Sequence, residues 1–206
     1  RLIATLLTTT AIPLCIWCAP VRGDDPTPVQ ELTPEALNQR VAELEGVLAN
    51  DPQDDAATKA LGIAYHFQAV KGLKNATAKA VAKLESALAK APSDYEIMCY
   101  LGSTKTMMAK TTWNPIQKLS YVNDGTALMD RAVKRAPDNI TVRMTRGANS
   151  LALPAFLNRV GCAVEDYAYL AERIEQSPVE LAAIRQPVTR ALAEARGRQA
   201  KNAKTE

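Results

Sequence analysis

Apolar residues recur along most of this chain at spacings of three and four, which is the period of one face of an α-helix. The first such stripe stops before Pro52 and consists of Leu37, Val41, Leu44 and Leu48. Similar stripes continue as far as Leu192, and short segments containing Pro, Gly, Asn or Asp separate them. The pattern predicts a series of amphipathic helices joined by turns.

Proline and glycine mark a repeat within this helical pattern. Three prolines each precede a glycine by ten residues, in the pairs Pro52 and Gly62, Pro92 and Gly102, and Pro137 and Gly147. Successive prolines are 40 and 45 residues apart, which is enough for two helices and their turn. The spacing predicts about three helix hairpins, the first over residues 53–91 with its turn at residues 71–75.

The first hairpin resembles the tetratricopeptide repeat family. The resemblance rests on Leu61, Gly62 and Tyr65 in its first helix and on Ala80, Leu84, Ala87 and Pro92 in its second. The chain departs from the family at Thr58, where Trp is preferred, and its units are longer than the family's 34 residues. An exported, bacterial-type member of this family would be all-α. The resemblance implies an α-solenoid over residues 35–200, with about three antiparallel hairpins and capping helices at both ends.

Capping residues predict where several helices begin. Thr33 precedes Pro34 and should cap the first helix, and Ser93 and Asp138 are the expected caps of the second and third hairpins. A final helix from about Val179 should cover the last hairpin, and residues 201–206 should fray.

The N-terminus has the order of a secretory signal. Arg1 precedes an apolar run over residues 2–17, and a polar break follows at residues 21–25. We therefore expect residues 1–23 to be cleaved, which places the mature protein in the periplasm or outside the cell. The alternative is an uncleaved membrane anchor, in which case the chain would contact a membrane. Residues 24–34 are rich in proline and should form an extended linker.

Composition limits the classes of partner. Hydrophobic residues make up 47% of the 206 positions and aromatic residues only 5%, a balance that suits packed helices. The net charge of +3 includes Arg1 and Arg22, so removal of residues 1–23 leaves +1. This charge gives no electrostatic case for nucleic acid binding.

The cysteines and the turns leave alternatives open. Cys15 and Cys18 lie inside the apolar run and are assigned no chemistry, whereas Cys99 and Cys162 are either free thiols or a disulfide. The long insert over residues 111–121 either forms a binding loop, or Trp113 packs over a hairpin end and Pro115 starts a longer helix. The second interpretation is favoured. The apolar turn at residues 153–157 should pack against the neighbouring hairpin.

Two arginines stand where the first hairpin has Thr58 and Leu61. Arg143 and Arg146 share one helix face and could hold a carboxylate, a phosphate or an acidic peptide. The favoured interpretation is an ion pair between hairpins, with candidate partners Asp124, Asp130 and Glu96.

Motifs of enzymes are absent from the sequence. It contains a single histidine, His66, and no G-x-S-x-G, phosphate loop or H-E-x-x-H motif. Glu165 and Asp166 are adjacent on a helix and would point in different directions, which makes a poor acid and base pair. We expect no catalysis, no metal and no cofactor.

The resulting functional hypothesis is an exported scaffold that binds a protein or peptide on its concave face. In the family the first helix of each hairpin lines that face, which implies contacts from Lys59, Ile63, His66, Glu96, Cys99, Ser103, Thr106, Met144, Ala148 and Leu151. Trp113, Arg143 and Arg146 are added as departures from the repeat. One alternative is a membrane-tethered structural or assembly subunit that forms homo-oligomers. The other is a binding protein for an anionic small ligand.

Overall fold

The computed structural model describes residues 27–203, and every regular element in that range is helical. The predictions for residues 1–23, which concern the signal, the anchor and the first two cysteines, lie outside the described residues. The helices are α1 Pro34–Asn50, α2 Asp55–Val70, α3 Ala76–Lys90, α4 Tyr95–Met108, α5 Pro115–Arg135, α6 Ile140–Ala152, η1 Ala155–Leu157, α7 Val160–Gln176 and α8 Ala182–Asn202.

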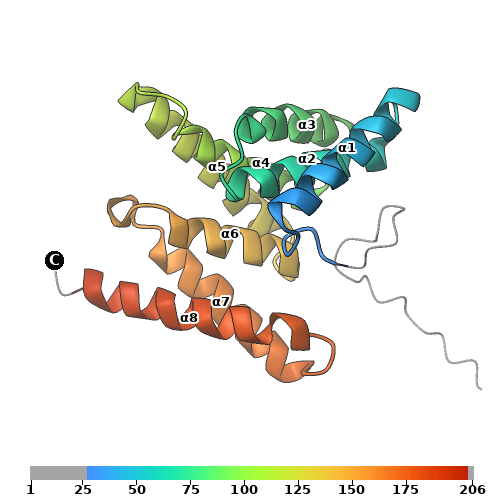
Figure 1. Ribbon diagram of the computed structural model, residues 1–206. Helices are drawn as coiled ribbons and strands as arrows, with labels where there is room; N and C mark the ends of the chain where they lie inside the picture. Colours follow the sequence, from blue (N-terminus) through green and yellow to red (C-terminus); the bar gives the residue numbers. More distant parts are fainter. Residues whose placement is uncertain (1–26, 204–206) are drawn as a thin grey trace, which may run out of the picture.

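Three antiparallel hairpins stack in chain order (Figure 1). The pairs are α2 with α3, α4 with α5, and α6 with α7, and α1 and α8 pack against the first and last pair. Consecutive hairpins meet mainly through the first helix of the later hairpin, since α4 contacts both α2 and α3, and α6 contacts both α4 and α5. The predicted all-α helical-repeat fold with a capping helix at each end is confirmed.

Side-chain caps explain why the first helices begin where they do. Asp54 Oδ1 accepts a hydrogen bond from the Ala57 N–H, and Asp94 and Asn139 cap α4 and α6 in the same way. The predicted cap Thr33 is confirmed, but Ser93 and Asp138 each lie one residue too early. The residue that follows each of them has a side-chain oxygen that reaches the first-turn N–H groups.

Close backbone contact joins the two helices of the middle hairpin. A Cβ placed on Gly102 would lie 2.5 Å from the Gly125 carbonyl oxygen, so neither helix has room for a side chain there. Gly62 is similarly close to Leu84, and Gly147 to the Tyr167 ring. The repeated glycine therefore marks a helix crossing.

Several local predictions differ from the structure. Pro115 starts a long second helix as favoured, but Trp113 is 97% exposed and does not pack over the hairpin end. The third turn forms η1 with Phe156 84% exposed, so the expected packing of this turn against a neighbouring hairpin is wrong for that side chain. The final helix starts at Ala182, after a turn, and continues to Asn202, into the segment expected to fray.

The proline-rich segment before α1 is attached to the helical body over its described part. Val29 packs against the first hydrophobic cluster, and Leu32 is buried. Apolar side chains at these two positions therefore dock residues 27–33, which differs from the extended linker that proline content predicted.

Candidate functional site

The expected concave face is mostly an interior surface. Each first helix is enclosed by its own partner helix and by neighbouring first helices, so most of its positions are covered. Seven of the thirteen residues expected to contact a partner are less than 9% exposed: Ile63, His66, Cys99, Ser103, Thr106, Arg143 and Arg146. Lys59, Glu96, Met144 and Leu151 are half-buried, and Ala148 and Trp113 are exposed. The accessible residues of the predicted set are therefore these six.

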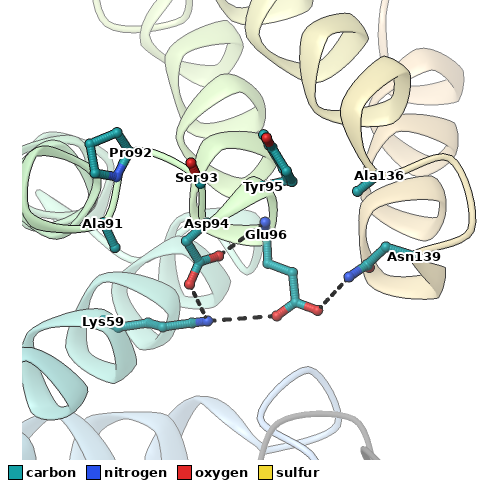
Figure 2. Close-up of a pocket in the computed structure, with 9 residues that line it drawn as sticks. All are labelled: Lys59, Ala91, Pro92, Ser93, Asp94, Tyr95, Glu96, Ala136 and Asn139. Atoms are coloured by element: carbon teal, nitrogen blue, oxygen red, sulfur yellow. Dashed lines mark hydrogen bonds and ion pairs between the residues drawn. The ribbon is translucent and has the colours of Figure 1, made fainter.

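Two of the six, Lys59 and Glu96, lie together in an open groove of about 590 Å³ (Figure 2). Lys59 Nζ lies 2.6 Å from Asp94 Oδ2 and 3.7 Å from Glu96 Oε2. On the other side, Asn139 Nδ2 donates to Glu96 Oε1 at 3.0 Å. Tyr95 completes the polar lining, so the groove offers a chain of donors and acceptors.

The groove joins the starts of consecutive hairpins. Asp94 and Asn139 are the caps of α4 and α6, and Lys59 lies just over one turn into α2. In both caps a side-chain oxygen accepts hydrogen bonds from backbone N–H groups of the first helical turn. Asp94 Oδ1, for example, accepts from the Glu96 and Ile97 N–H groups. Glu96 and Lys59 therefore carry the ionic groups that can exchange partners without uncapping a helix.

A buried ionic network occupies the third hairpin. Asp166 on α7 is fully buried and accepts from Arg143 Nη1 at 3.0 Å. It also accepts from Arg146 Nε and Nη2, each at 2.8 Å. Glu165 accepts from both arginines, and Arg146 Nη1 donates to Asp130 on α5 at 3.2 Å. The network thus links both helices of the third hairpin to the second hairpin.

Arg159 extends the network and brings it to charge balance. Its two terminal nitrogens donate to Asp130 at 2.9 and 2.6 Å, so three guanidinium groups face three carboxylates. Burial alone would raise the pKa of Asp130, but hydrogen bonds from Arg159 and the nearby Arg146 hold that pKa below its usual range. Burial likewise favours the neutral form of Arg146, and the hydrogen bonds to Asp166 reverse this and raise the pKa of Arg146.

The favoured interpretation is that the arginines form ion pairs between hairpins. They do form ion pairs, but only one of the three predicted partners is among them. The prediction of Asp130 is confirmed, whereas neither Asp124 nor Glu96 forms an ion pair with Arg143 or Arg146 within residues 27–203. The main partners are Glu165 and Asp166, which the sequence presented only as a poor catalytic pair. Because the arginines already donate to carboxylates, they offer little to an anionic ligand.

His66 has a packing role in the first interface between hairpins. Its Nδ1 is 2.9 Å from Thr104 Oγ1 on α4, and its ring meets Phe67 edge to face with centroids 5.1 Å apart. Burial lowers its pKa to about 3, so the ring is neutral near pH 7. A neutral, enclosed imidazole with a hydroxyl partner has no access to a substrate.

The two thiols within residues 27–203 are free. Cys99 is buried in α4 and its Sγ donates to the Val142 carbonyl oxygen at 3.4 Å, whereas Cys162 is half-buried. Burial raises the pKa of both thiols, which keeps them protonated. Of the two alternatives for this pair, the structure has the unpaired form.

Residues 27–203 bring together no group of three or more His, Cys, Asp or Glu side chains able to hold a metal ion. In the same range, no helix has both the length and the apolar character to cross a membrane.

A second accessible surface lies at the end of the α4–α5 hairpin. Trp113 is 97% exposed, Ile116 79% and Leu119 51%, and we call these three residues the apolar end of the hairpin. Sequence reasoning singled out Trp113 but missed Ile116 and Leu119. The available signal was the inserted length of this hairpin, which produces a second helix of 21 residues opposite a first helix of 14.

Comparisons with family models, with curated proteins and with solved structures find no match to this chain.

Proposed function

We propose that this chain is a non-catalytic helical-repeat scaffold, of the tetratricopeptide type that its first hairpin resembles, and that it binds a segment of a partner protein. The observation that carries the proposal is the open groove at the starts of α2, α4 and α6. The groove contains Lys59 and Glu96, two residues expected to contact a partner. Stacked helical repeats commonly present such extended surfaces to other proteins.

The groove chemistry suits an extended polypeptide. Lys59 supplies an ammonium donor, Glu96 supplies carboxylate acceptors and Asn139 supplies an amide. A peptide backbone offers one donor and one acceptor at each residue, so it can replace the long 3.7 Å contact between Lys59 and Glu96 with two shorter bonds. The bound segment would then cross from the first to the third hairpin.

The location proposed for this scaffold is outside the cytoplasm. It rests on the charge, apolar run and polar break of residues 1–25. Mass spectrometry of the protein purified from its host should find a mature N-terminus at Asp24. A chain that keeps residues 2–17 would instead support the tethered assembly subunit.

A peptide-display selection on the full chain tests the proposed groove. Peptides selected by the wild type should bind about tenfold or more weakly to Lys59→Ala and to Glu96→Ala, because each variant removes a charged hydrogen-bonding group. Lys105→Ala is the matched control, since Lys105 also pairs with a carboxylate, Glu85 at 2.8 Å, but lies outside the groove.

Affinity can be measured by fluorescence anisotropy with circular dichroism of each variant recorded alongside. Peptides that bind both groove variants as tightly as the wild type would refute the groove, and so would a selection that enriches no sequence.

A further inference from the structure

The end of the α4–α5 hairpin extends beyond the rest of the stack. Gly102 on α4 faces Gly125 on α5, and the two helices run antiparallel. Met108, the last residue of α4, is therefore level with about residue 119 of α5. The first turn of α5 continues past that point, and Figure 1 shows it reaching outward at the upper left.

This extension carries apolar side chains that are exposed and not covered by the other helices. Ile116 and Leu119 are three residues apart and share one side of the helix. Trp113 precedes them in the turn and is almost fully accessible. Most other large apolar side chains of the described residues are buried or partly buried. Three exposed ones within seven positions are therefore unusual.

Positive charge surrounds this apolar end. Residues 97–123 contain three lysines and no carboxylate. Lys105 is paired with Glu85 at 2.8 Å, but Lys110 and Lys118 are exposed and form no ion pair within residues 27–203. The Lys118 ammonium lies 5.9 Å from the centroid of the Trp113 ring. The nearest carboxylate along α5 is Asp124, to which Ser120 donates at 3.4 Å.

The backbone of the turn is already hydrogen-bonded. Asn114 Oδ1 accepts from the Ile116 N–H at 2.9 Å and from the Gln117 N–H at 3.3 Å. Thr111 N–H donates to the Met108 carbonyl oxygen at 2.9 Å. The turn can therefore enter a less polar environment without leaving these groups unsatisfied, which lowers the cost of doing so.

We propose that the apolar end of the α4–α5 hairpin docks on an anionic lipid surface, separately from the peptide groove. Trp113, Ile116 and Leu119 would enter the interfacial region, and Lys110 and Lys118 would contact acidic headgroups. Trp is favoured at such interfaces, and basic residues beside apolar ones strengthen binding to anionic lipids.

A lipid surface fits this end better than a protein does. The three side chains expose on the order of 450 Å² if a Trp offers about 250 Å². A stable protein interface buries about 800 Å² on each partner. The end also projects outward, and a projecting apolar group can enter a lipid interface without a complementary surface to receive it.

The experiment measures the fluorescence of Trp113 in the full chain. The sequence contains two tryptophans, so Trp17→Phe leaves Trp113 as the sole emitter. Vesicles of phosphatidylcholine with phosphatidylglycerol should shift its emission to shorter wavelength and protect it from aqueous quenchers. Vesicles of phosphatidylcholine alone should give little response, and added salt should weaken the response.

Two charge-reversal variants test the lysines. Lys110→Glu combined with Lys118→Glu should weaken the affinity for anionic vesicles, measured by titration of the Trp113 emission, about 30-fold or more. This is the change expected for the loss of two basic contacts. The control is Lys71→Glu combined with Lys74→Glu, which reverses two exposed lysines in the α2–α3 turn, and it should bind like the parent.

Three outcomes would overturn the proposal. The first is an unchanged Trp113 emission with anionic vesicles, even if the chain sediments with them through residues 2–17. The second is an equal response to neutral vesicles or in the Lys110 and Lys118 variant. The third is a shift that appears with rising protein concentration in the absence of vesicles, which would assign this end to a second copy of the chain. Peptide binding in the groove is measured separately, so either proposal can fail alone.

Discussion

Removing the Asp166 carboxylate should destabilise the fold more than any surface change. Asp166→Asn removes the charge that accepts from Arg143 Nη1 at 3.0 Å and from two nitrogens of Arg146 at 2.8 Å. Both arginines are less than 10% exposed and would keep their charge inside the protein. Breaking a buried pair in this way costs about 3–5 kcal/mol of the free energy of unfolding. For a chain of this size the midpoint should fall by roughly 10 °C.

Thermal and urea unfolding followed by circular dichroism measure this loss. Glu165→Gln is the matched control, because Glu165 is the next residue, contacts the same arginines and has a side chain 58% exposed. It should lose less than about 1 kcal/mol. A midpoint for Asp166→Asn within 2 °C of the wild type, about the change that a surface substitution makes, would refute the reasoning.

A triple variant separates the cost of an unpaired charge from the value of the network. Counting back from the repeated glycines, Arg143 and Arg146 match Met98 and Leu101, which are buried in α4. Arg143→Met, Arg146→Leu and Asp166→Leu together should recover most of the stability lost in Asp166→Asn, because apolar groups of similar volume can replace a buried ion pair. A triple variant less stable than Asp166→Asn would show that the network itself stabilises the interface.

Two further predictions concern the helix crossing and the buried histidine. Gly125→Ala should cost about 1–3 kcal/mol by forcing α5 away from the Gly102 carbonyl oxygen, whereas Gly46→Ala, with nothing within 4 Å of the added Cβ, should stabilise α1 by about 0.5–1 kcal/mol. Urea unfolding checks both, and similar effects of the two would contradict the crossing geometry. Burial lowers the pKa of His66 from 6.5 to about 3, so the unfolded chain alone binds a proton between these values. The contribution of neutral His66 to the free energy of unfolding should be fully present above pH 6.5. Below that pH the free energy of unfolding should fall by up to about 1.4 kcal/mol per pH unit, and His66→Gln should lose that dependence. Equal slopes for wild type and variant between about pH 6.5 and 5.5 would contradict this.

Local signals in the sequence were sufficient for the helical framework. Pro52, Pro92 and Pro137 each lie in the turn before the first helix of a hairpin, and the glycine ten residues later lies at a helix crossing in all three cases. Both features depend on residues near one another in the chain and on a backbone requirement that few residue types meet. The caps were predicted to within one residue for the same reason.

The candidate surfaces depended on contacts that no local pattern encodes. The family pattern placed His66, Cys99 and Ser103 on a concave face, but in this chain α2, α4 and α6 lie close enough to cover them. The burial of a residue in a repeat protein depends on the angle between successive units. That angle follows from the summed packing of side chains such as Tyr100 and Met129, which single-residue rules cannot supply.

Departures from the repeat have two different physical consequences here. Arg143 and Arg146 occupy positions that the other hairpins bury, so a charge there must find a partner inside the protein, and Asp166 is that partner. The inserted length before and within α5 instead adds residues beyond the reach of α4, so Trp113 and Ile116 have no internal neighbour to cover them. A charged substitution at a buried position is therefore compensated by a partner inside the protein, whereas added length in a hairpin creates new exposed surface. For this reason the vesicle experiment is aimed at the hairpin end and not at the arginines.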